Sequence, residues 1–196
     1  HMQVKMEKNF SVAAPIQDVW DFMTNIEKVC TCIPGAQYTD DLGDEKHAVL
    51  LTVKVGPIKS SYRGEATIRN MDANSYTIEI EGKGTDTKGK GGATMELVGK
   101  LTATDDHGTE VSGDSTVAIQ GMLAQFGSRM IEDVSNQLFD QFTTSLRGKL
   151  EGDALSASGA GLNQGDQVLS GLSVAGAAIK GAAGRLVDSV KKKTEK

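Results

Sequence analysis

Apolar side chains recur at every second position along most of the chain between residues 3 and 119. Turn-forming residues interrupt the pattern at Gly56-Pro57, at residues 72–75 and at residues 105–108. Period-2 patterning between turn signals predicts an antiparallel sheet with one packed face and one wet face. After a first strand at residues 3–12, the predicted inward rows are Val49, Leu51, Val53 and Val55; Tyr62, Gly64, Ala66 and Ile68; Tyr76, Ile78 and Ile80; Ala93, Met95, Leu97 and Leu101; and Val111, Val117 and Ile119.

Helical spacing appears before and after this sheet. Pro15 stands where a helix often begins, and Ile16, Val19, Trp20 and Met23 follow at helical intervals. A second short helix is expected over residues 25–30, ended by Cys32-Ile33-Pro34-Gly35. Residues 122–150 predict one long helix of roughly 40 Å, able to cover a curved sheet. Its apolar face contains Leu123, Phe126, Met130, Ile131, Val134, Leu138, Phe142 and Leu146.

The remaining chain divides into a linker and a tail. Residues 151–167 are small and polar, which predicts a flexible linker. In residues 168–196, Leu172, Ile179, Leu186 and Val190 share one helical face, and Lys191, Lys192 and Lys193 follow. Several glycines weaken a free helix here by about 1 kcal/mol each. The tail is therefore either a disordered terminus or an amphipathic helix that adsorbs reversibly to an anionic membrane surface.

Charge and cysteine content narrow the function classes. The net charge of −5 gives no reason to expect nucleic-acid binding, and residues 180–196 hold six basic and two acidic residues. We expect His1 to be a cloning remnant before Met2. No secretory signal and no run of 18 apolar residues is found. Two cysteines one residue apart cannot form a disulfide framework, so a reducing cytoplasm is expected.

Three features have both a chemical and a structural interpretation. Cys30 and Cys32 supply two ligands for a metal or redox site, but their surroundings favour small buried side chains beside a turn. Residues 82–92 are glycine-rich but lack the strand–loop–helix context of a phosphate loop, so a glycine-bent strand pair is favoured. His107 lies in a predicted hairpin turn, and no nucleophile elbow occurs, so a Ser/His/Asp set finds no support.

The apolar rows admit two interpretations as well. They form an ordinary core, or they line a lipid-like pocket in which flexible methionines accommodate a guest. Sequence pattern alone favours the core.

Short motifs add a family resemblance. A strand, two short helices, a long meander and a long helix, in that order, resemble the α+β helix-grip fold of START-like and Bet v 1-like proteins. Residues 32–36 (CIPGA), 53–58 (VKVGPI), 62–64 (YRG) and 121–131 (GMLAQFGSRMI) resemble the CoxG family of carbon monoxide dehydrogenase subunits. The similarity covers roughly residues 2–150, and the last motif is the most specific.

The resemblance implies an accessory protein of a molybdenum-containing hydroxylase, a place at the cytoplasmic membrane and a deep apolar cavity between sheet and helix. We therefore expect a helix-grip domain at residues 2–150 that is not an enzyme and binds a quinone such as menaquinone or ubiquinone, with no covalent cofactor and no metal. A ligand-free membrane tether and an enzyme acting on a hydrophobic molecule are the alternatives. The expected ligand-binding residues are Trp20, Ile33, Val53, Tyr62, Ile78, Met95, Leu97, Met122, Leu123, Phe126, Met130 and Val134; the expected membrane-binding residues are Leu172, Ile179, Leu186, Val190, Lys191, Lys192 and Lys193.

Overall fold

The computed structural model describes residues 2–157, which contain seven strands, two short helices, one 3-10 helix and one long helix. The chain separates into two compact units, residues 1–140 and 141–196, and the site discussed below belongs to the first. The elements are β1 (Met2–Val12), α1 (Ile16–Met23), α2 (Ile26–Cys30), β2 (Ala36–Gly43), β3 (Lys46–Val55), β4 (Ile58–Asp72), β5 (Thr77–Asp86), β6 (Gly91–Ala103), β7 (Thr109–Gly121), η1 (Met122–Phe126) and α3 (Gly127–Ala157).

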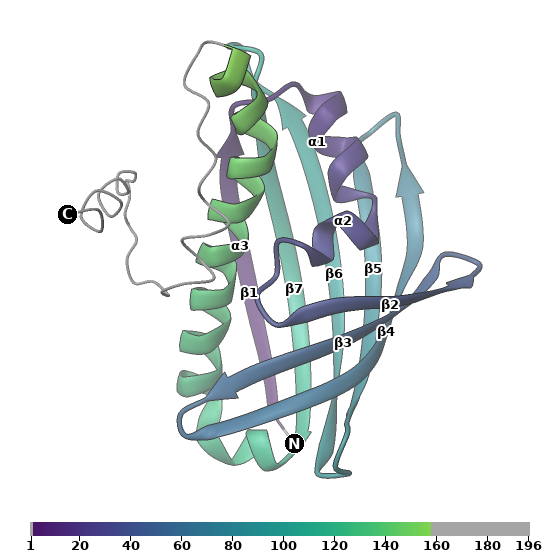
Figure 1. The fold of residues 1–196 in the computed structure, drawn as a ribbon, viewed down its shortest axis with the longest axis vertical. Helices are drawn as coiled ribbons and strands as arrows, with labels where there is room; N and C mark the ends of the chain where they lie inside the picture. Colours follow the sequence, from purple (N-terminus) through teal and green to yellow (C-terminus); the bar gives the residue numbers. More distant parts are fainter. Residues whose placement is uncertain (1, 158–196) are drawn as a thin grey trace, which may run out of the picture. The chain divides into compact units, whose positions relative to one another are not determined.

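All seven strands form one antiparallel sheet in the order β1-β7-β6-β5-β4-β3-β2. Figure 1 shows β2, β3 and the adjoining part of β4 crossing over β5, β6 and β7, so the sheet is strongly curved. The predicted hairpin turns are confirmed, because β3 ends at Val55 before Gly56-Pro57 and β6 ends at Ala103 before residues 105–108. The curved antiparallel sheet with a long C-terminal helix confirms the predicted α+β helix-grip fold.

The first two helices begin and end at the residues that the sequence indicated. Pro15 precedes α1, and the side chain of Asn25 accepts a hydrogen bond from the Lys28 N–H at the start of α2. On α1, Val19 is fully buried, and Trp20 packs edge-on against Tyr76 with ring centroids 5.4 Å apart.

Two elements differ from the sequence-based prediction. The single helix expected over residues 122–150 is wrong: η1 occupies its first turn, and α3 begins at Gly127 and continues to Ala157. Gly121 and Gly127 both have positive φ angles (95° and 84°), which interrupt a regular α-helix on each side of η1. Strand β2 was not predicted, because most of its side chains are exposed and give no apolar alternation.

The first part of α3 packs against β1. Phe139 contacts Phe10 edge-on with ring centroids 5.6 Å apart. The ammonium group of Lys8 donates a 2.6 Å hydrogen bond to the Asn136 side-chain oxygen and lies 5.1 Å from the centre of the Phe139 ring. These contacts hold residues 127–140 beside the first strand of the sheet.

Candidate functional site

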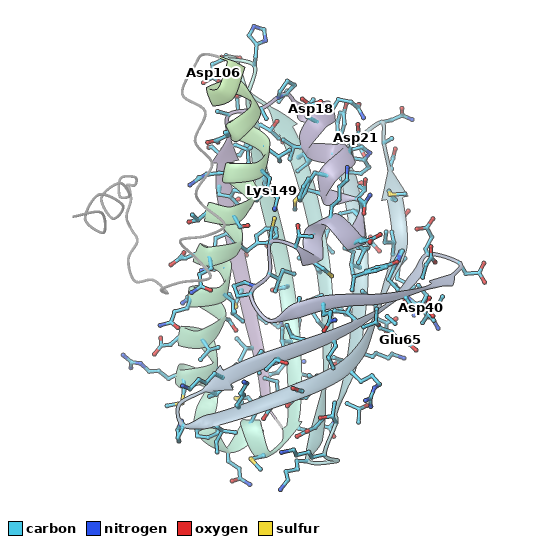
Figure 2. All side chains as sticks on the ribbon, in the orientation of Figure 1. Asp18, Asp21, Asp40, Glu65, Asp106 and Lys149 are labelled. Atoms are coloured by element: carbon cyan, nitrogen blue, oxygen red, sulfur yellow. The ribbon has the colours of Figure 1, made fainter. Side chains whose placement is uncertain are left out.

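The inner face of the sheet is the face that bears Val4, Tyr62 and Ile119. Paired strands place Val4, Val117, Met95, Gly82 and Ala66 in one row across five strands. The opposite face carries the polar residues of the alternation, such as the Lys46–Glu65 ion pair (3.7 Å), and Figure 2 labels Glu65 on β4. The predicted inward and outward rows of β4 are thus confirmed.

One end of the inner face is a closed apolar cluster. Its buried members come from four strands, η1 and α3, and partly buried side chains surround them. The buried residues are Val4, Val55, Tyr62, Ile119, Leu123 and Ile131, and the partly buried ones are Met2, Met6, Val53, Ile58, Ala93, Val117, Ala124, Phe126 and Val134.

The far end of the inner face is also buried, whereas the middle is not. Side chains near α1 are nearly inaccessible, and those halfway along the strands retain partial exposure although they point to the same side. The buried residues at the far end are Val12, Ile68, Ile78, Leu101 and Val111; the half-buried ones in the middle are Val49, Ala66, Ile80, Met95 and Leu97. An apolar strip between two packed ends is the surface best suited to a hydrophobic guest.

Glycines occupy the part of this strip formed by β4 and β5. Gly64 and Gly84 are directly opposite each other, and Gly82 lies opposite Met95. A Cβ atom at Gly64 would lie 2.8 Å from the Lys83 carbonyl oxygen, so only glycine permits this close strand approach. At Gly82 a Cβ atom would meet only the Met95 side chain, at 3.5 Å, and the Glu65 carbonyl oxygen, at 3.9 Å.

Three polar side chains stand at the closed end of the strip. Ser60 and Tyr62 are alternate residues of β4, and Asp86 of β5 is opposite Tyr62. All three are buried. Burial and then the Asp86 carboxylate raise the pKa of Tyr62, so the phenol keeps its proton at neutral pH.

The rim beside this end contains long apolar side chains from η1 and α3. The Sδ atom of Met130 and the ring of Phe126 approach Gly56 in the β3–β4 turn, because a Cβ atom there would lie 3.8 Å and 4.0 Å from them. Met130 is 37 % exposed, so it lies at the edge of the apolar strip rather than within it.

Two surface hollows of the described residues are polar. A hollow of about 260 Å³ on the outer face is lined by Gln3, Lys5, Thr94, Glu96, Thr116 and Ala118. The other, of about 440 Å³, lies between the first helices and the β2–β3 hairpin and is lined by Asp21, Thr24, Asn25, Ile26, Glu27, Tyr38, Asp41, Glu45 and His47. Figure 2 labels Asp21 on α1, beside this second hollow. Neither matches an apolar cavity.

The cysteines have the properties of structural side chains. Cys30 and Cys32 are both buried thiols. Burial and then the Glu27 carboxylate raise the pKa of Cys30, which disfavours the thiolate needed for metal binding or redox chemistry. Within residues 2–151, no three His, Cys, Asp or Glu side chains are placed to hold a metal ion.

The structure distributes the predicted ligand-binding residues over three places. Tyr62 and Leu123 belong to the buried cluster, and Val53, Phe126 and Val134 pack on it. The half-buried strip contains Met95 and Leu97, whose side-chain ends lie over Gly82 and Gly113. Met122 is half-buried on η1, Ile33 is half-buried in the turn after α2, and Trp20 and Ile78 are buried nearer α1.

Two polar residues of the site were missed. Ser60 extends the inward alternation of β4 two residues before Tyr62, which is a signal that the sequence contains. Asp86 lies in the glycine-rich stretch, where its burial follows from the pairing with Tyr62. The predicted membrane-binding residues from Leu172 to Lys193, and the linker beyond Ala157, lie outside the described residues. Among the helices that are described, none combines the length and apolarity needed to cross a bilayer.

Solved structures share the fold at low sequence identity. A conserved protein from Geobacillus kaustophilus is 19% identical with a TM-score of 0.70, over 76% of this chain and 97% of its own. The Zhui aromatase/cyclase from Streptomyces sp. R1128 is 16% identical (TM-score 0.60; 81% and 99% covered). A START superfamily protein from Mycobacterium smegmatis is 14% identical (TM-score 0.53; 75% and 97% covered).

No curated protein sequence matches the chain significantly. One protein family does, and it is CoxG, a family of carbon monoxide dehydrogenase subunits. The match spans residues 9–151, from within β1 into α3, and includes the whole inner face except the start of β1. This chain therefore belongs to the CoxG family of carbon monoxide dehydrogenase subunits.

Proposed function

We propose that this protein is an accessory protein that binds an apolar small molecule on the inner face of its sheet. It links a molybdenum-containing hydroxylase of the carbon monoxide dehydrogenase type to the inner face of the cytoplasmic membrane. The observation that carries the proposal is the half-buried apolar strip, which includes Met95 and Leu97, between two fully packed ends. Membership of the CoxG family supplies the class of partner enzyme.

A quinone such as menaquinone or ubiquinone is the preferred ligand. A hydroxylase that oxidises its substrate must pass on electrons, and quinones are confined to the bilayer by their apolar chains. A protein that shields a quinone from water while it contacts the enzyme would join the two. The required surface is apolar with few polar groups, which matches a strip bordered by Ser60, Tyr62 and Asp86.

The membrane contact is assigned to residues 168–196. Their apolar residues and the three lysines at 191–193 fit reversible adsorption, with each basic residue adding about 1 kcal/mol near an anionic surface. Such binding is weak enough to release the protein to its partner.

A catalytic role is not part of the proposal. The inner-face phenol of Tyr62 has a raised pKa, which makes it a poor base at neutral pH. A docking role without a ligand is the second candidate, and the polar lining of the 260 Å³ and 440 Å³ hollows favours it.

Native mass spectrometry of the full chain, with organic extraction of the same sample, separates the two candidates. The ligand proposal expects a retained apolar molecule with the mass of a quinone. Preparations that never hold such a guest, and that take up none when mixed with menaquinone, would leave only the docking role.

Liposome flotation tests the tail. Removing residues 168–196 should leave thermal unfolding of the domain unchanged and reduce flotation with anionic vesicles. A full-length variant with Lys191, Lys192 and Lys193 replaced by Gln is the matched control for charge, and its loss should disappear at high salt. Equal flotation of the full chain and the truncated form would contradict the assignment.

A further inference from the structure

The hydroxyl of Tyr62 is a polar group within an apolar cluster. The side chain is only 8 % exposed and packs with Val55, Leu123 and Ile131. Among residues 2–151, no side chain or backbone group forms a hydrogen bond with this hydroxyl. Buried polar groups of folded proteins almost always have a partner. The phenol therefore points to a partner that does not belong to the described residues.

Ser60 and Asp86 complete the polar end of the strip. Ser60 lies two residues before Tyr62 on the same strand and face, is 9 % exposed, and likewise has no side-chain hydrogen bond within residues 2–151. Asp86 already has a partner, because its Oδ1 accepts a 2.9 Å hydrogen bond from the Lys88 N–H. Two hydroxyls therefore remain to bind a ligand, next to a carboxylate that is occupied.

These groups select the chemistry of the ligand. Tyr62 stays protonated, since burial and Asp86 both raise its pKa, and it is therefore a hydrogen-bond donor. A donor requires an acceptor oxygen on the guest. The buried Asp86 carboxylate disfavours a second negative charge nearby, so a fatty-acid anion fits poorly and a neutral oxygen fits well.

We propose that Tyr62, assisted by Ser60, is the polar anchor of the apolar-ligand site and donates a hydrogen bond to a neutral carbonyl oxygen of an otherwise hydrocarbon ligand. This inference rests on the proposed function, because it requires that the inner face holds an apolar guest. It adds the chemical class of the guest and the residue that orients it. The hydrocarbon portion lies along Met95, Leu97 and the glycines of β5.

Binding of three probes to the full chain tests the anchor by isothermal titration calorimetry. The probes are 2-methyl-3-prenyl-1,4-naphthoquinone, the matching naphthalene without carbonyl oxygens, and palmitate. The wild-type chain should bind the quinone about tenfold more tightly than the naphthalene, the size expected for one hydrogen bond to a buried donor. Palmitate should bind more weakly than the quinone.

Tyr62→Phe removes only the hydroxyl. Its affinity for the quinone should fall about tenfold, to that of the naphthalene, and its affinity for the naphthalene should not change. Ser60→Ala is a second, smaller perturbation and should weaken quinone binding in the same direction. Tyr38→Phe is the matched control, because the Tyr38 hydroxyl already lies 2.7 Å from Nδ1 of His47, and it should bind every probe like the wild type.

The outcomes separate the anchor from the proposed function. If the quinone and the naphthalene bind equally and Tyr62→Phe alters neither, the anchor is wrong while apolar binding stands. If palmitate binds most tightly, the neutral-oxygen assignment is overturned. If no probe binds the wild-type chain, the ligand-binding function itself fails, and the anchor fails with it.

Discussion

Replacing Gly82 with leucine tests whether the inner face has room for a guest. Gly82 lies in the middle of the strip, opposite Met95 on one side and Ala66 on the other. A Cβ atom there would lie 3.5 Å from the terminal methyl and 3.7 Å from the Cβ of Met95, which is ordinary contact. The nearest backbone atom is the Glu65 carbonyl oxygen, at 3.9 Å.

The size of the effect depends on what lies above the glycine. If the strip is open, the leucine extends over apolar neighbours, and the loss of a flexible glycine from the unfolded chain favours folding by about 0.4–1 kcal/mol. If protein side chains already fill the space, overpacking costs about 1–3 kcal/mol. For a domain of this size each kcal/mol shifts the melting temperature by roughly 2–4 °C.

Gly64→Ala is the matched control for a crowded glycine on the same face. Its new methyl would lie 2.8 Å from the Lys83 carbonyl oxygen, a backbone atom that cannot move aside alone. We expect a loss of about 1–3 kcal/mol from this clash. Urea unfolding of both variants, with the slope compared as well as the midpoint, provides the free energies.

An open strip predicts that Gly82→Leu is stable within about 1 kcal/mol of the wild type and retains less of any apolar guest, because the leucine occupies the space of that guest. If Gly82→Leu is destabilised as much as Gly64→Ala, the strip is filled and the reasoning is refuted. Unchanged retention in a stable Gly82→Leu variant would place the guest elsewhere.

Two further predictions concern stability. Gly127→Ala should cost about 1 kcal/mol, because φ is 84° although no atom crowds the new methyl; a thermal melt that matches the wild type would show that η1 and α3 join differently. The carboxyls of Asp72, Glu81 and Asp106 have lowered pKa values, chiefly through hydrogen bonds from the Asn74 N–H, the Arg69 side chain and the Thr104 hydroxyl, respectively. Their contribution is complete above the unfolded pKa of about 4 and is lost as pH falls through the folded values, so the urea midpoint should drop below about pH 4, and less steeply in Asp72→Asn.

Local sequence predicted the elements whose side chains alternate strictly or follow a helical period. The inward row Tyr62, Gly64, Ala66 and Ile68 was found because a strand buries every second residue. The same rule failed for β2, whose side chains are mostly exposed because it is the edge strand. The joint at Gly127 was hidden by the apolar period, which continues from η1 into α3 while the backbone is interrupted.

The sequence by itself determined the family, the sheet and the kind of surface on its inner face, because these follow from short motifs and from which residues avoid water. Only the tertiary structure decided which apolar residues are fully packed and which keep partial exposure. Met95 and Leu101 are equally apolar members of one predicted row, yet Leu101 is buried and Met95 is half-buried. The pairing of β4 with β5 likewise brought Asp86 beside Tyr62. Exposure and pairing depend on neighbours distant in the chain, which no local period encodes.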